Sequence, residues 1–213
     1  MKDESSNKTR NYRQSTRARA AEETGHRVLD AFLVHLQAQW FDEIRLDDVA
    51  KEAGVTVQTV IRRFGGKEGL LHAASNRMQE EIVGERTPAA LDVGRAVDTL
   101  IAEYEMAGPL MMRLLSQEDR YPAIRAIADR GRATHREWVG DVFARWLPAF
   151  PPEKRRKVHD RLVIALDLYV WKLLRTDMGR SLEELRTAML EMATAALELE
   201  PGDLERSTIL SEA

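Results

Sequence analysis

The sequence predicts an all-α protein, on three observations about its 213 residues. Apolar residues recur at helical spacing in nearly every long segment, and no stretch alternates for long enough to form a half-buried strand. The composition is 44% hydrophobic, which is ample for a buried core, and it contains no cysteine. Glycine and proline divide the chain into segments of helix length. We expect an amino-terminal three-helix unit followed by a longer helical unit.

The composition also narrows the class of protein. Without cysteine, the chain can form no disulfide, thiolate zinc site or thiol nucleophile, which fits a reducing compartment. The first twenty residues lack the apolar core of a signal peptide, and Asp167 and Lys172 interrupt the most apolar later run, residues 162–174. The sequence therefore predicts a cytoplasmic protein with no membrane partner.

The first helix is expected at about residues 20–40. Its apolar side comprises Val28, Leu29, Phe32, Leu33, Leu36 and Trp40. Ahead of it, residues 8–20 hold five Lys and Arg and no acid, although the net charge of the whole chain is -3. This segment predicts a flexible basic arm over residues 1–19, for which a solvated tail is the alternative.

Two short helices follow, separated by a glycine. Asp47 and Asp48 lie where the positive end of a helix dipole favours them, at the start of a helix that ends at Ala53. Gly54 can adopt the left-handed conformation that ends a helix, and Thr56 can cap the next one. Helix, glycine turn and second helix over Val57–Phe64 predict a helix-turn-helix.

The remaining helices follow from glycines and prolines. Gly65 and Gly66 end the helix-turn-helix, and Lys67 begins a fourth helix that runs towards Arg86. Beyond Pro88 the predicted helices are residues 88–107, 110–118, 122–147, 152–176 and 181–199. The expected domains are the basic arm, a helix-turn-helix unit at residues 20–86, a longer helical unit at residues 87–200, and a tail at residues 201–213.

The last two predicted helices carry apolar stripes at steps of three and four, the spacing of nearly parallel helix packing. Two such stripes predict an antiparallel pair, and a second copy would complete a four-helix interface by two-fold symmetry. Burial of both stripes inside one subunit is the alternative. The predicted dimer residues are Leu162, Ala165, Tyr169, Leu173, Leu182, Leu185, Met189, Met192 and Ala196.

The composition of Val57–Phe64 is not that of a helix selected only for packing, because its β-branched run lowers helix propensity. A recognition helix places its first residues against base edges in the major groove, so the residues at those positions are selected for contact with DNA. Gln58 can pair with adenine through both groups of its amide, while Arg62 and Arg63 can reach phosphates or a guanine. Lys67 adds a charge beside free backbone N–H groups, which suits a phosphate. This chemistry predicts binding to double-stranded DNA.

The amino-terminal segment at residues 24–86 resembles the tetracycline-repressor (TetR) family of bacterial regulators. The resemblance is carried by Asp48-Val49-Ala50, Ala53-Gly54-Val55-Thr56, Thr59, Phe64 and Gly66-Lys67-Glu68 with Leu70. A weaker similarity at residues 171–184 looks like the connection between the two dimerising helices of the family. The resemblance implies a DNA-binding transcriptional regulator, commonly a repressor, that binds a palindromic operator as a homodimer and is released by a small-molecule effector.

The sequence departs from the family pattern at several positions, among them Gln58, where glycine is common, and the tyrosine and histidine that typically contact phosphates. Family members often have tyrosine at 61 and histidine at 63, where this chain has Ile61 and Arg63, and a Ser or Thr near 45, where it has Arg45. Ile61 cannot donate a hydrogen bond, so that contact is lost or moves to an arginine. The predicted DNA-binding residues are Arg17, Arg19, Arg45, Thr56, Val57, Gln58, Thr59, Arg62, Arg63 and Lys67.

The resemblance also implies an effector pocket between the middle helices. The candidate lining residues are apolar or aromatic with a few polar tips, and core packing is the alternative for each. They are Tyr104, Met111, Met112, Leu115, His135, Trp138, Val142, Trp146, Leu166 and Trp171.

Two other functions compete with the regulator. An enzyme is disfavoured, because the five histidines show no metal-site pair and the chain has no nucleophile elbow, P-loop or dinucleotide fingerprint. No catalytic residue, metal or cofactor is therefore predicted. A helical protein-binding adaptor whose helix-turn-helix does not bind DNA is the second alternative, and salt-dependent binding to duplex DNA would separate it from a regulator.

Overall fold

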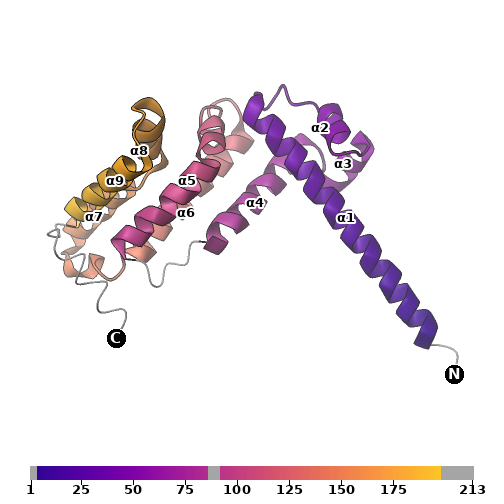
Figure 1. The fold of residues 1–213 in the computed structure, drawn as a ribbon, viewed down its shortest axis with the longest axis horizontal. Coiled ribbons are helices and arrows are strands. Elements are labelled where there is room, and N and C mark those ends of the chain that lie inside the picture. The colour runs from indigo at the N-terminus through magenta and orange to yellow at the C-terminus, as the bar shows by residue number, and fades with distance from the viewer. Residues whose placement is uncertain (1–3, 86–91, 198–213) are drawn as a thin grey trace. The chain divides into compact units, whose positions relative to one another are not determined.

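The computed structural model describes residues 4–85 and 92–197, with side chains from residues 18–80 and 92–197. Every regular element in this part of the chain is helical (Figure 1). The chain divides into two compact units after Met78, within helix α4 (Lys67–Glu85). The predicted domain limits at 86 and 87 and the predicted tail at 201–213 lie outside the described residues.

The first unit is built from α1 (Glu4–Ala38), α2 (Leu46–Glu52), α3 (Val57–Phe64) and the start of α4. The range predicted for α3 is confirmed. Apolar side chains from all four helices form the core of this unit, and burying each contributes roughly 1.5–3 kcal/mol. The buried residues include Val28, Phe32, Leu36, Val49, Val60, Leu70 and Leu71.

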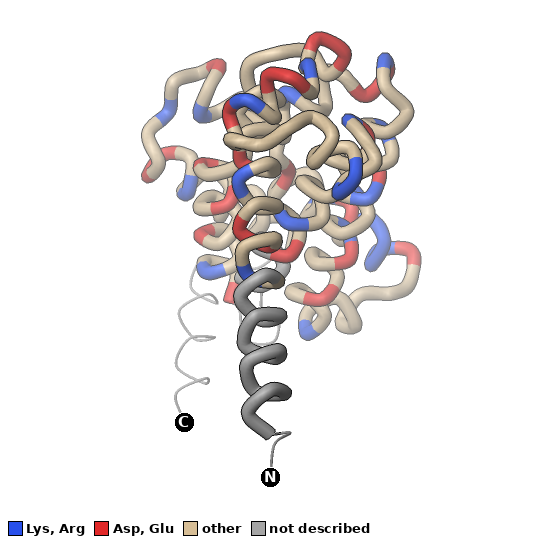
Figure 2. Tube along the Cα trace, turned by 90° about the vertical axis from the view of Figure 1, so that its right-hand side faces the viewer, with Lys and Arg blue, Asp and Glu red and all other residues tan. Residues whose placement is uncertain are grey.

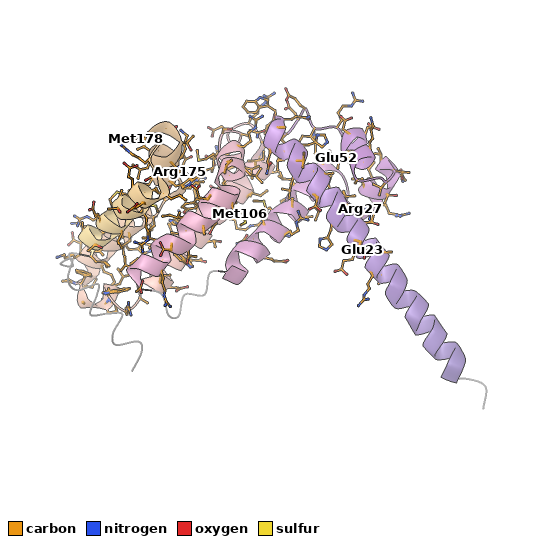
Figure 3. All side chains as sticks on the ribbon, in the orientation of Figure 1. Glu23, Arg27, Glu52, Met106, Arg175 and Met178 are labelled. Carbon is orange, nitrogen blue, oxygen red and sulfur yellow. The ribbon has the colours of Figure 1, made fainter. Side chains whose placement is uncertain are left out.

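Polar links tie α1 to the other helices of this unit. Nε of Arg27 donates to the Ala53 carbonyl at 3.3 Å, beside the turn that follows α2. An ion pair joins Arg77 of α4 to Asp30 at 2.8 Å. Arg27 and Glu52, both labelled in Figure 3, lie on α1 and α2. α1 is therefore the helix against which the short helices are held.

The start of α1 differs from the prediction. The helix begins at Glu4, so residues 4–19 are helical where the sequence predicted a flexible arm. This stretch contains neither glycine nor proline and several good helix formers, so nothing in it interrupts a helix that is already nucleated downstream. The predicted arm is corrected to an extension of α1.

The second unit is a helical bundle. Its helices are α5 (Val93–Leu115), α6 (Pro122–Val142), α7 (Pro152–Ala165), α8 (Leu168–Trp171) and α9 (Leu182–Ala196), with a 3-10 turn at Leu147–Ala149 and a π-helical turn at Lys172–Asp177. α7 packs beside α9, and α5 packs against both α6 and α9 (Figure 1). No helix in the described residues is long and apolar enough to cross a membrane.

Two predicted helix boundaries in this unit are wrong. α5 runs through Pro109, where the sequence predicted a break, because Ala107, Leu110 and Leu114 hold both halves against the core. Conversely, the helix predicted over 152–176 stops at Ala165, and Asp167 caps α8 by accepting from the Tyr169 N–H at 2.8 Å. In the first case, burial of the flanking residues outweighs the tendency of proline to break a helix. In the second, a local cap starts a new helix.

Candidate nucleic-acid interface

The turn before α3 has the geometry of a helix-turn-helix. Gly54 has a φ of 67°, a left-handed conformation that suits glycine, and the next residue, Val55, donates its N–H to the Ala50 carbonyl at 2.9 Å. Thr56 then caps α3, accepting from the Thr59 N–H at 3.2 Å. Both expectations for the turn are confirmed.

α3 has a buried side and an exposed side. Val60 is fully buried, with Val57 and Phe64 partly buried on the same side. Gln58, Ile61 and Arg62, spaced three and four residues apart, are exposed. We call these three side chains the α3 outer face.

The predicted site does not include Ile61, because this side chain cannot donate a hydrogen bond. The structure leaves its side chain 41% exposed on the α3 outer face, three residues after Gln58. An aliphatic group at such a position fits a thymine methyl, which needs no donor. The three-residue spacing from Gln58 was the signal that could have identified it.

The two threonines of the predicted site act within the protein. Their hydroxyl oxygens lie 3.0 Å apart, and that of Thr56 also caps α3. Thr56 is exposed and Thr59 is partly buried. Thr56 thus fixes the start of α3, and its predicted contact with DNA stays a prediction.

Arg63 points back onto α1 and does not belong to the α3 outer face. Its Nη1 donates to the Ala21 carbonyl at 2.6 Å. Its guanidinium also lies so close to Gly25 that a methyl group there would come within 2.3 Å of Nη2. The structure therefore brings Arg63 to the α1–α3 contact, whereas the sequence grouped it with Arg62.

Lys67 is also engaged by the protein. Its Nζ donates to the carbonyls of Asp42 and Ile44 at 2.9 and 3.0 Å, and lies 5.1 Å from the Phe41 ring centroid. Burial lowers the pKa of Lys67, and the nearby Asp42 offsets part of this effect. Lys67 thus holds the α1–α2 loop on the first turn of α4, and its contact with phosphate stays a prediction.

The other predicted cations are more exposed. The Arg45 side chain, at the position before α2, is 74% exposed, with its guanidinium 4.0 Å from Asp47. Arg19 is exposed on α1, and the side chain of Arg17 lies outside the described part. Figure 2 shows Lys and Arg interspersed with Asp and Glu along the described trace, so the case for an interface rests on α3 itself.

Most residues predicted to line a pocket belong to the core of the second unit. Tyr104, Trp138, Val142, Leu166 and Trp171 are buried in it, and Met111, Met112 and Trp146 pack against it. Leu115 and His135 are partly buried. The polar tips are used internally, because the Tyr104 hydroxyl donates to the Leu166 carbonyl at 2.9 Å and Trp171 Nε1 donates to Glu105 at 2.7 Å. Effector binding by these residues stays a prediction.

The predicted dimer stripes require a correction. Five of their residues have no surface to offer a second subunit, because α7 and α9 bury them against each other and the core of the same unit. These are Leu162, Ala165, Leu185, Met189 and Ala196. Tyr169, Leu173, Leu182 and Met192 are exposed, and so are Ile164 and Met178, which lie outside the predicted stripes. Met178, at the end of the π-helical turn, is labelled in Figure 3.

Comparisons with known proteins agree with this geometry. Residues 35–74 match the model of bacterial regulatory proteins, tetR family. The chain is 31% identical over 97 residues to the HTH-type transcriptional regulator AlkX of Mycobacterium tuberculosis, matching 42% of this chain and 46% of that protein. It is 38% identical over 71 residues to the HTH-type transcriptional regulator SrpR of Pseudomonas putida, matching 33% of each. The matches thus span less than half the length of these relatives.

Two solved structures show the same fold. A tetR-family transcriptional regulator from Streptomyces coelicolor aligns with a TM-score of 0.62 at 20% identity, over 90% of this chain and 99% of that one. A transcriptional regulator from Rhodococcus sp. Rha1 aligns with a TM-score of 0.63 at 15% identity, over 82% of this chain and 96% of that one.

Proposed function

Because the chain belongs, through its helix-turn-helix unit, to the tetR family of bacterial regulatory proteins, we propose that it is a transcriptional regulator that binds an operator in double-stranded DNA. The observation that carries this proposal is the α3 outer face on a capped helix. Gln58, Ile61 and Arg62 are exposed together, while the opposite side of α3 is anchored in the core.

Each side chain of the α3 outer face suits a different part of the duplex. The Gln58 amide can donate to and accept from adenine, and Ile61 can pack on a thymine methyl beside it. Arg62, one turn into α3, can reach a phosphate or a guanine. Arg45 and Arg19, both exposed, supply further charge for the backbone.

We propose that the regulator acts as a homodimer. Of the large apolar side chains exposed in the described residues, six lie between Ile164 and Met192, on α7, α8, the π-helical turn and the residue after it, Met178, and α9. We call these six the α7–α9 apolar face. A two-fold pair joined through this face presents two α3 helices, as a palindromic operator requires.

Release by a small molecule is the remaining part of the proposal. A ligand that binds one arrangement of the second unit more tightly than another shifts the population of the dimer, and with it the spacing of the two α3 helices. Half-sites in successive major grooves lie roughly 34–36 Å apart, so a change in spacing lowers operator affinity. In this proposal the regulator represses transcription while it is bound to the operator, and release by the ligand ends the repression.

Selection from random duplexes tests the DNA-binding function. The winning sequences should be palindromic, and affinity for the best of them should fall steeply with salt, by a log–log slope of about -0.9 for each phosphate neutralised. The same operator, titrated with and without candidate ligands, then tests the effector response. Failure to bind any duplex at low salt would support the protein-binding adaptor.

A further inference from the structure

The contact between Arg63 and Gly25 joins two helices that the sequence gives no reason to link. Arg63 lies in the last turn of α3, and Gly25 lies in the middle of α1. A methyl group built on Gly25 would meet Nη2, Cζ and Nε of Arg63 at 2.3, 2.6 and 2.6 Å. All three guanidinium atoms therefore lie over the bare backbone of this one residue.

Glycine at this position lowers the stability of α1, and a close contact that needs the space can offset that loss. A glycine in a helix interior weakens the helix relative to alanine, and Gly25 lies 13 residues before the end of α1. It is also buried, so it is not a surface site where any small residue would serve. The Arg63 guanidinium takes the space that a side chain would fill.

The same guanidinium is also fixed by a hydrogen bond. Nη1 of Arg63 donates to the Ala21 carbonyl at 2.6 Å, one helical turn before Gly25. Arg62, the preceding residue, carries the same charge but lies about 100° further round α3, on the exposed α3 outer face. The two adjacent arginines thus have different roles.

We infer that Arg63 is a positioning residue, which clamps the carboxy-terminal turn of α3 onto Ala21 and Gly25 of α1 and so sets the angle at which Gln58 and Ile61 are presented. This inference rests on the proposed DNA-binding function. It replaces the sequence-based expectation that Arg63 contacts phosphate or guanine. Gly25 then contributes to the specificity for the operator sequence, although it has no side chain, because it leaves room for the Arg63 guanidinium.

The experiment compares Arg63→Ala, Arg63→Lys, Gly25→Ala and the double variant Gly25→Ala/Arg63→Ala, with Arg62→Ala as the matched control. Affinity for the selected operator and for a scrambled duplex is measured across a salt series. Lysine keeps the charge but cannot cover Gly25 with a planar group, so Arg63→Lys should behave like Arg63→Ala. Both should lose roughly tenfold in the ratio of operator to scrambled affinity while keeping the parental salt slope.

Gly25→Ala should reproduce this loss, because its methyl group displaces the guanidinium. The double variant should be no worse than either single variant, since both changes break one contact. Arg62→Ala should instead weaken both duplexes and reduce the salt slope by about one. Wild-type affinity in Arg63→Lys, together with a slope reduced by about one in Arg63→Ala, would overturn the clamp and make Arg63 a phosphate contact.

Thermal unfolding tests the clamp independently of DNA binding. If the parent binds no duplex, the DNA-binding function fails, but the contact still makes a prediction about stability. Gly25→Ala should raise the unfolding temperature in the Arg63→Ala background and lower it, or leave it unchanged, in the parent. Equal shifts in both backgrounds would show that the guanidinium does not occupy this space, and the clamp would be wrong.

Discussion

Gln58 is the residue of the α3 outer face with the most specific chemistry. If Gln58 pairs with one base as proposed, Gln58→Ala removes that bidentate contact, so it should cost roughly 1–3 kcal/mol at one base pair and leave the other positions unchanged. Selection repeated with the variant should show relaxed preference at that position alone. A uniform loss across all duplexes, as expected for Arg62→Ala, would contradict base readout by Gln58.

Lys67 should matter more for folding than for DNA. Lys67→Ala leaves the carbonyls of Asp42 and Ile44 without their charged donor, which should lower the free energy of unfolding by about 1–3 kcal/mol. Arg45→Ala is the control, because its side chain is 74% exposed and its loss should change stability by less than about 0.5 kcal/mol. Urea unfolding of the two variants measures the difference, and equal stabilities would contradict a structural role for Lys67.

At this scale the sequence predicts local chemistry well and long-range partners poorly. The Thr56 cap and the left-handed Gly54 follow from neighbours within three residues, and both are confirmed. The partners of Arg63 and Lys67 lie 42 and 25 residues away, so no local pattern could assign them. Both arginines of α3 look alike in sequence, and only the fold separates them.

At the scale of elements, glycine in a helix has opposite effects in α5 and α6. A methyl group on Gly108 would lie 2.6 Å from the Trp171 ring, which is buried and held by Glu105. Gly108→Ala should therefore destabilise the protein by about 1–3 kcal/mol. Gly131 is exposed with nothing within 4 Å, so Gly131→Ala should stabilise α6 by about 0.5–1 kcal/mol. Thermal unfolding should give shifts of opposite sign.

An ion pair at the turn between α5 and α6 should make the free energy of unfolding depend on pH. A hydrogen bond from Arg132 at 2.6 Å lowers the pKa of Glu118 below 4.5, its ordinary value, although partial burial opposes this. Stability from this carboxylate is present above pH 4.5 and is lost as the pH falls through the folded-state pKa. Glu118→Gln should therefore be less stable than the parent at pH 7, and thermal unfolding should show the gap closing in acid. A constant gap would contradict this pairing.

The sequence predicts helix boundaries correctly where glycine or proline positions agree with the packing of the helices. Gly65 ends α3 and Pro152 begins α7, as the sequence indicates. Pro109 and Asp167 mislead for opposite reasons, because burial on both sides of Pro109 keeps α5 whole while the Asp167 cap splits an apolar run that reads as one helix. Helical periodicity identifies the stripes of α7 and α9, but it does not tell whether a stripe packs within a subunit or between subunits.

At the scale of the whole molecule, the α7–α9 apolar face makes a prediction about assembly. Leu173 is 51% exposed on the π-helical turn, so Leu173→Glu places a charge where a second subunit would pack. Light scattering should show the parent as a dimer and Leu173→Glu shifted to monomer. Val34 of α1 is 54% exposed, and Val34→Glu should leave the dimer intact. A monomeric parent would contradict the homodimer.

The exposed side chains from Ile164 to Met192 also bear on synthesis in the cell. In the proposed homodimer, a subunit that has not yet paired exposes these apolar side chains, and chaperones and proteases in the cell bind such surfaces. Chains emerging from neighbouring ribosomes on one messenger would pair soonest. A subunit that pairs slowly would then stay exposed to degradation for longer than one that pairs quickly.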